Sequence, residues 1–135
     1  MRRLVTLSSL LAIGAAPPTE PPAGEGVICM MGLINAAAEV GRRCYPGQNA
    51  VFQAELEREV VRIDQYVLKN STANSAQIAE FKRKQARVGA PQSELCRADI
   101  IGVYKAYVSA GAEKLKLETD KLLARAGTPT WGDCL

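Results

Sequence analysis

The sequence predicts an all-α protein, a single small bundle of four or five helices cross-linked by two disulfides. Apolar residues recur every three or four positions almost throughout residues 27–135, and no run shows the two-residue alternation of a β-strand. The chain also holds four cysteines and no histidine, behind an N-terminal segment typical of exported proteins. These observations together indicate a helical domain that works in an oxidising compartment.

The first two helices are predicted by different patterns. Residues 27–43 are apolar and alanine-rich, and they end at the turn-forming residues 45–47. Their apolarity indicates a central position in the bundle. Residues 49–69 have the clearest amphipathic pattern, because their large apolar residues step by three or four along one face.

The later helices are predicted from capping residues and glycines. Asn74 follows a polar break and can cap a third helix, with Gln77 at the capping-box position, and this helix is expected to end at Gly89. The apolar pattern resumes at Ser93 and passes Gly111. Either one long helix or two results, because a glycine inside a helix costs only about 1 kcal/mol relative to alanine.

Three segments are expected along the chain. Residues 1–15 carry two arginines, an apolar run and small residues, which is the order of a signal peptide. That run is shorter than the roughly 20 residues of a membrane-spanning helix. Residues 16–26 are rich in proline and glycine and predict a disordered spacer, and residues 27–135 form the helical disulfide-bonded domain. We therefore expect a periplasmic or secreted protein with no transmembrane segment in the mature chain.

The charge of the mature chain argues against nucleic acid as a partner. Loss of Arg2 and Arg3 with the signal peptide lowers the formal net charge from +3 to +1. A nearly neutral chain lacks the strong positive field by which proteins bind phosphate backbones.

The cysteines indicate structural disulfides, because none lies in a Cys-x-x-Cys motif that would favour a zinc or redox site. Cys29 and Cys44 lie at opposite ends of the first predicted helix, about 22 Å apart, well beyond the roughly 7 Å limit for a bridge. In an up-and-down bundle Cys44 and Cys96 lie at the same end. We therefore expect Cys44 to pair with Cys96, and Cys29 with Cys134.

A basic cluster on the third predicted helix is the candidate contact with an anionic or acidic partner. Cations near the C-terminal end of a helix are also favoured by the helix dipole, so a solvated helix face is the simpler interpretation. The cluster consists of Lys82, Arg83, Lys84 and Arg87.

Catalysis without histidine would have to use carboxylates, as glycosidases do with two groups about 5 to 9.5 Å apart. Glu55 and Glu59 lie one turn apart on the second predicted helix, and the other acidic candidates are scattered later in the chain. A solvated helix face explains all of them, so no catalytic residue, metal or cofactor is expected. The scattered candidates are Asp99, Glu113, Glu118 and Asp120.

Two exported families share parts of this plan. Helical acid-stress chaperones of the bacterial periplasm are similar in their export signal and in a disulfide between helices. Residues 29–34 and 44–48 resemble the opening of the helical, cysteine-bridged immunity proteins that protect bacteria from secreted cell-wall toxins. This chain has its two cysteines closer together and ends differently, so no functional residue is carried over from either family.

The sequence therefore favours a non-enzymatic protein-binding module of the inhibitor, immunity or envelope-stress type. The expected partner is another envelope or secreted protein. A carboxylate-dependent hydrolase of the cell envelope is the first alternative, and two acidic side chains that converge in a cleft would favour it. A purely structural envelope component is the second alternative.

Overall fold

In the computed structural model, residues 26–125 and 127–130 are described, and they confirm the all-α prediction with six helices. The prediction of four or five helices is wrong in number, because a single helical turn beside Cys96 adds a sixth to the five that a divided C-terminal pattern gives. The helices are α1 (Val27–Cys44), α2 (Ala50–Asn70), α3 (Ser75–Gln85), α4 (Gln92–Leu95), α5 (Ala98–Ala110) and α6 (Ala112–Leu123).

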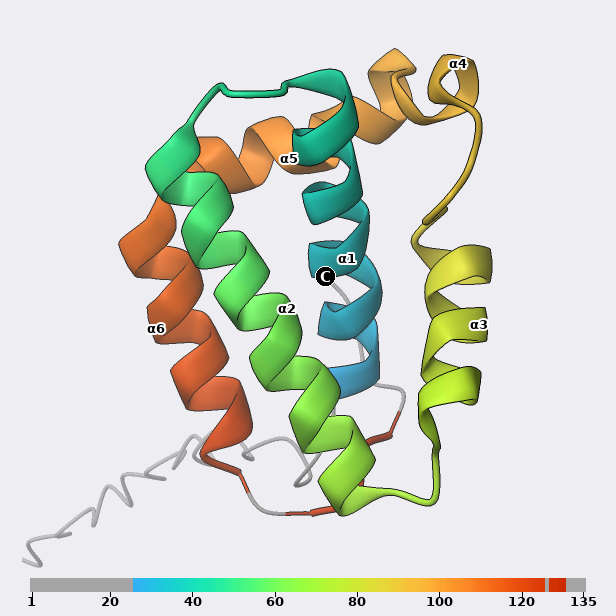
Figure 1. Ribbon diagram of the computed structural model, residues 1–135. Coiled ribbons are helices and arrows are strands. Elements are labelled where there is room, and N and C mark those ends of the chain that lie inside the picture. The colour runs from blue at the N-terminus through green and yellow to red at the C-terminus, as the bar shows by residue number, and fades with distance from the viewer. Residues whose placement is uncertain (1–25, 126, 131–135) are drawn as a thin grey trace, which may run out of the picture.

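The apolar helix α1 is the centre of the structure. It packs against α2, α3 and α5, while α6 packs mainly against α2 (Figure 1). Val27, Ile34 and Val40 of α1 are fully buried. Figure 1 shows α2 and α6 side by side, with α3 on the other side of α1 and α5 across one end of the bundle. The pair α2 and α6 therefore forms one outer face of the molecule.

The capping box of α3 is confirmed. The Asn74 side chain accepts a hydrogen bond from the backbone N–H of Gln77, whose side chain accepts one from the Asn74 N–H. The prediction that this helix ends at Gly89 is wrong, because it ends at Gln85. Arg87 takes a left-handed conformation, and the Val88 N–H donates to the Lys82 carbonyl, which closes the helix before Gly89. The buried carboxylate of Glu39 on α1 accepts a hydrogen bond from the Gly89 N–H.

Gly111 decides the choice between one C-terminal helix and two. Its φ of 90° and ψ of 161° are accessible to glycine and strongly disfavoured for other residues. The chain turns there between α5 and α6, so α6 lies along α2.

The Cys44–Cys96 pairing is confirmed, with 5.7 Å between the two Cα atoms. Cys44 is the last residue of α1 and Cys96 follows α4, so the bond ties that turn to the end of the central helix. The expected partner of Cys29, Cys134, lies outside the described residues, as do the predicted signal peptide and residues 16–25 of the spacer. Cys29 itself is buried and is not a free thiol.

None of the helices in the described part of the chain has both the length and the apolar character needed to cross a membrane.

Candidate functional site on the α2–α6 face

The buried contacts between α2 and α6 fix the polar side chains that lie at their edge. Leu115 and Thr119 of α6 are 3% and 0% exposed, and the Thr119 hydroxyl donates to the Leu115 carbonyl at 3.0 Å. No buried hydroxyl is left unpaired at this contact. The buried apolar residues of α2 are Phe52, Leu56, Val60, Ile63 and Val67.

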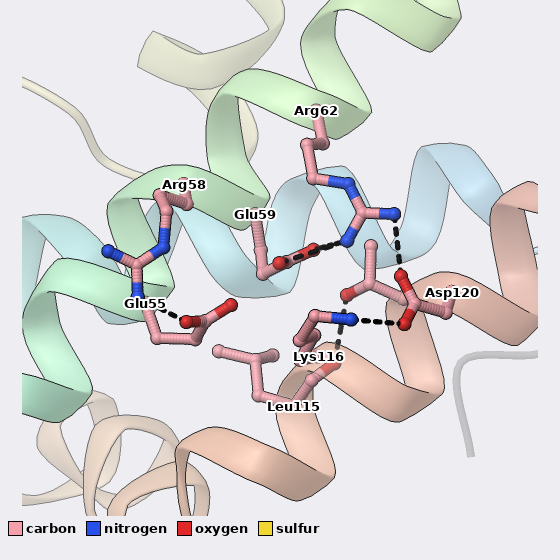
Figure 2. Close-up of polar contacts among 8 residues, drawn as sticks. Glu55, Arg58, Glu59, Arg62, Leu115, Lys116 and Asp120 are labelled. Carbon is pink, nitrogen blue, oxygen red and sulfur yellow. Dashed lines mark hydrogen bonds and ion pairs between the residues drawn. The ribbon is translucent and has the colours of Figure 1, made fainter.

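Two glutamates on α2 converge beside this contact. Glu59 is 1% exposed, and its carboxylate receives hydrogen bonds from Arg62 at 3.0 and 2.8 Å (Figure 2). Glu55 lies one turn earlier and pairs with Arg58, and its side chain is 12% exposed. Each glutamate is therefore held by the arginine three residues later on the same helix.

The surroundings shift the pKa values of the two glutamates in opposite directions. Burial raises the pKa of Glu59, and a hydrogen bond with the Glu55 carboxyl raises it further against the opposing effect of Arg62. The hydrogen bond from Arg58 lowers the pKa of Glu55. When the pair carries one proton, that proton lies on Glu59.

Asp120 connects this pair to α6. It accepts from Arg62 at 2.7 Å and from Lys116 at 2.7 Å (Figure 2). Hydrogen bonds from Lys116 and from Arg62 lower the pKa of the Asp120 carboxyl, which stays ionised at neutral pH. Arg62 thus bridges carboxylates on both helices.

A groove of about 650 Å³ lies over the same contact, and we call it the α2–α6 groove. Val51 on α2 and Leu117 on α6 belong to its lining and are 79% and 51% exposed. Exposed apolar side chains beside charges of both signs are typical of a protein contact surface. The lining residues are Val51, Glu55, Ala112, Glu113, Lys114, Lys116, Leu117 and Asp120.

The Glu55 and Glu59 pair differs from a glycosidase pair in its spacing and in its access to the groove. Glu55 and Glu59 do converge, but their carboxyl groups are in hydrogen-bonding contact. Glycosidases keep the two groups about 5 to 9.5 Å apart so that a sugar bond or a water fits between them. Glu59 does not line the groove and is closed off by Arg62.

Sequence reasoning identified Glu55 and Glu59 as neighbours but missed their burial and their link to Asp120. The arginines at i+3 were a visible signal, although the same spacing occurs on solvated helix faces. The structure does not bring the other acidic candidates into this cluster. Asp99 pairs with Arg97 and Glu118 with Lys121, while Glu113 lines the groove.

The basic cluster of α3 does not form a single positive surface. Lys82 is mostly buried and pairs with Asp64 of α2, whereas Arg83 and Lys84 both pair with Glu80. Arg87 follows the helix in a left-handed conformation, with φ of 56°, and is exposed. Three of the four cations therefore already have an acidic partner.

A second groove of about 660 Å³ lies between α1, the end of α2 and α3. Met31 and Val67 in its lining are 2% and 1% exposed, so much of its apolar lining is already covered by neighbouring side chains. Thr72 and Thr128 in its lining are exposed, so this groove is also open to a partner. Among the described residues, no group of three or more His, Cys, Asp or Glu side chains is placed to hold a metal ion.

The fold defines the class of protein: it is small, all-helical and disulfide-bonded. No protein-family model matches the chain, and neither a curated protein nor a solved structure matches it.

Proposed function

We propose that this is a non-enzymatic protein-binding module that works in the periplasm or outside the cell, as an inhibitor, immunity or envelope-stress protein. Its partner is another envelope or secreted protein, held at the α2–α6 groove. The observation that carries the proposal is the exposure of Val51 and Leu117, at 79% and 51%, on opposite helices of one groove. Folding leaves these two apolar side chains in water, and a partner would bury them.

The charges along the groove support a specific contact. Glu113 and Asp120 are acidic, whereas Lys114 and Lys116 are basic, all within the lining. Such a mixed border selects a partner by matching charges more than by overall attraction. The buried packing of Leu115 and Thr119 against α2 holds the two helices together, and the Arg62–Asp120 ion pair joins them at the edge, so the groove is formed before the partner arrives.

Export is part of the same proposal. The Cys44–Cys96 disulfide supports an oxidising compartment, where such bonds persist. We propose residues 1–15 as a cleaved signal peptide and a second bond between Cys29 and Cys134. Mass spectrometry of the exported protein, with non-reducing peptide mapping, tests both points. A mature chain that retains residue 1, or a Cys134 thiol that reacts with alkylating reagent, contradicts them.

Site-specific photo-crosslinking tests the binding site. A photoreactive residue at Leu117, in the mature oxidised protein mixed with an envelope extract of its own organism, is expected to label one protein strongly. The matched control carries the same group at Lys105, which is exposed on α5 away from the groove. Equal labelling from the two positions, or no labelled protein, contradicts the proposed site.

Convergence of Glu55 and Glu59 favours one second candidate, a carboxylate-dependent hydrolase of the cell envelope. A pair whose pKa values are driven apart is the usual basis of acid and base roles. A panel of glycan and peptide substrates, tested with the natural protein and with Glu55→Gln, decides it. Turnover that Glu55→Gln abolishes would replace binding with catalysis as the function.

A further inference from the structure

The second groove described above lies at the end of the bundle where α1 begins, and we call it the α1–α3 groove. Its volume of about 660 Å³ is large enough for several side chains. An apolar surface of this size, left open by the rest of the fold, is typical of a place where another segment or molecule binds. Its floor is formed by the buried residues Met31, Val67 and Ile78, with the half-buried Ile28 and Phe81 beside them.

The chain itself enters this groove after α6. Thr128 and Pro129 belong to the lining, together with residues of α1, α2 and α3. The Tyr66 hydroxyl donates to the Arg125 carbonyl at 2.7 Å, which fixes the segment that follows α6 against α2. Residues 131–135 therefore begin at the border of the groove, two residues after Pro129.

The other end of this segment is expected at the same groove. Cys29 is 4% exposed, is not a free thiol, and follows Ile28 of the lining. The disulfide proposed above joins Cys29 to Cys134. Pro129 and Cys134 are five residues apart in the sequence, so they lie at most about 18 Å from each other. With that disulfide, on which this inference rests, the chain between them has to cross close to the groove.

The composition of the two ends of the chain favours the C-terminal segment as the occupant. Residues 131–135 include Trp131 and Leu135. A tryptophan side chain alone buries about 150 to 250 Å². Residues 16–25, which precede α1, contain no aromatic residue and no Val, Ile, Leu or Met. They have no large side chain with which to fill an apolar groove.

Two features of the groove match the C-terminal segment. Phe81 offers a half-buried ring, on which an indole can stack or pack edge to face. Lys69 is exposed in the lining and forms no ion pair with another described residue, while Asp133 is the one acidic side chain of the segment. The groove thus provides an aromatic partner for Trp131 and a cation for Asp133.

We propose that residues 131–135 form a strap across the α1–α3 groove, with Trp131 packed on Phe81 and Asp133 beside Lys69. The strap covers the apolar floor, holds α3 against α1 and closes this groove to other molecules. It goes beyond the binding function proposed for the α2–α6 groove, because it assigns the second groove to the chain itself.

Fluorescence tests the strap directly, because Trp131 is the only tryptophan of the chain. In the mature oxidised protein, acrylamide is expected to quench it at least threefold less than in the same protein unfolded in urea. Phe81→Ala is expected to raise quenching at least twofold, and Phe81→Leu is used if that variant does not fold. Ile101→Ala, at a half-buried residue of α5 outside the lining, is the matched control. Quenching as strong as in urea, or an equal rise in both variants, overturns the proposal.

Binding of the apolar dye ANS tests whether the strap covers the floor. Trp131→Ala is expected to bind at least threefold more dye than the natural protein, whereas Trp131→Phe keeps a ring and stays close to the natural value. Equal dye binding by the natural protein and Trp131→Ala overturns the strap.

Non-reducing peptide mapping of the same samples separates the strap from the disulfide. A shielded Trp131 beside a reactive Cys134 thiol contradicts the disulfide and supports the strap. An intact Cys29–Cys134 bond with a fully quenched Trp131 contradicts the strap alone.

Discussion

The ring of Tyr104 on α5 occupies the space beside Gly41 on α1 where a side chain would otherwise lie. A Cβ atom added to Gly41 would come within 2.8 Å of the Tyr104 Cε2 atom. The tyrosine cannot move aside easily, because it is 1% exposed and its ring is stacked on Tyr45 with 5.1 Å between centroids. Its hydroxyl also accepts from Asn49 and Gln53. Gly41 therefore allows α5 to cross α1 at close range.

Gly41→Ala is expected to destabilise the fold by about 1 to 3 kcal/mol, because the added methyl group overpacks this crossing. Gly102→Ala on α5 is the matched control, since a Cβ there meets no atom within 4 Å. That control is expected to stabilise the fold by about 0.5 to 1 kcal/mol, through the better helix propensity of alanine. Urea unfolding measures both, and an equal effect of the two substitutions would contradict the close contact.

The free energy of unfolding is expected to fall as pH rises, because of Glu59. Because burial and Glu55 raise its pKa in the folded state, the folded protein binds the Glu59 proton more tightly than the unfolded chain does. The resulting stabilisation is complete below the unfolded pKa and is lost as pH rises through the folded value. Glu59→Gln keeps a neutral side chain there, so it is expected to remove this loss on the alkaline side.

Urea unfolding of the natural protein and of Glu59→Gln, at a series of pH values from acid to neutral, measures this effect. The variant is expected to gain stability relative to the natural protein as pH rises. A constant difference between the two proteins at every pH would rule out proton uptake by Glu59.

Glu39 is predicted to make the fold less stable as pH falls, which is the opposite of the effect of Glu59. Burial alone would raise its pKa, but hydrogen bonds from Arg42, from the Gly89 N–H and from Arg43 outweigh burial and lower it. Its stabilisation is present above the unfolded pKa and is lost as pH falls through the folded value. Glu39→Gln is expected to cost about 2 kcal/mol at neutral pH, because hydrogen bonds to a charged group are lost.

This cost should shrink in acid, where the natural side chain is also neutral. The same unfolding series measures it, with Glu118→Gln, an exposed glutamate on α6, as the control for removing a charge. A cost for Glu39→Gln that grows as pH falls would contradict the lowered pKa.

Reduction of the Cys44–Cys96 bond is expected to destabilise the protein strongly. The two residues are 52 positions apart in the sequence, and closing a loop of that length is worth about 4 kcal/mol in the chain-entropy model. The double variant Cys44→Ala, Cys96→Ala isolates this bond from any other. An unchanged melting temperature in that variant would show that α4 is held by its packing alone.

Local patterns in the sequence were sufficient for much of the fold. The step of three and four in α2, the Asn74 and Gln77 capping box, and the pairing of Cys44 with Cys96 all follow from neighbouring residues or helix lengths. The end of α3 did not, because the left-handed turn that closes it lies at Arg87 and not at a glycine, so the local pattern does not mark it.

The candidate site was predictable only in part, for a related reason. Glu55 and Glu59 are spaced like any solvated acidic pair, and only the packing of Leu115 and Thr119 against α2 buries one of them. The exposure of Leu117 is likewise set by tertiary packing. The sequence of α6 contains several leucines, and its pattern alone does not tell which of them stays in water. Sequence reasoning therefore identified the acids but not the groove above them.

Binding at the α2–α6 groove is the central claim, and quantitative affinity capture tests it most directly. The mature oxidised protein, Leu117→Glu and Val61→Glu would each be used to capture proteins from an envelope extract of the same organism, with quantification by mass spectrometry. Val61 is an exposed residue of α2 outside the groove lining, so its variant is the matched control. The account predicts one protein that is enriched by the natural chain and by Val61→Glu, but at least tenfold less by Leu117→Glu. Equal recovery with Leu117→Glu, or no enriched protein at all, would contradict it.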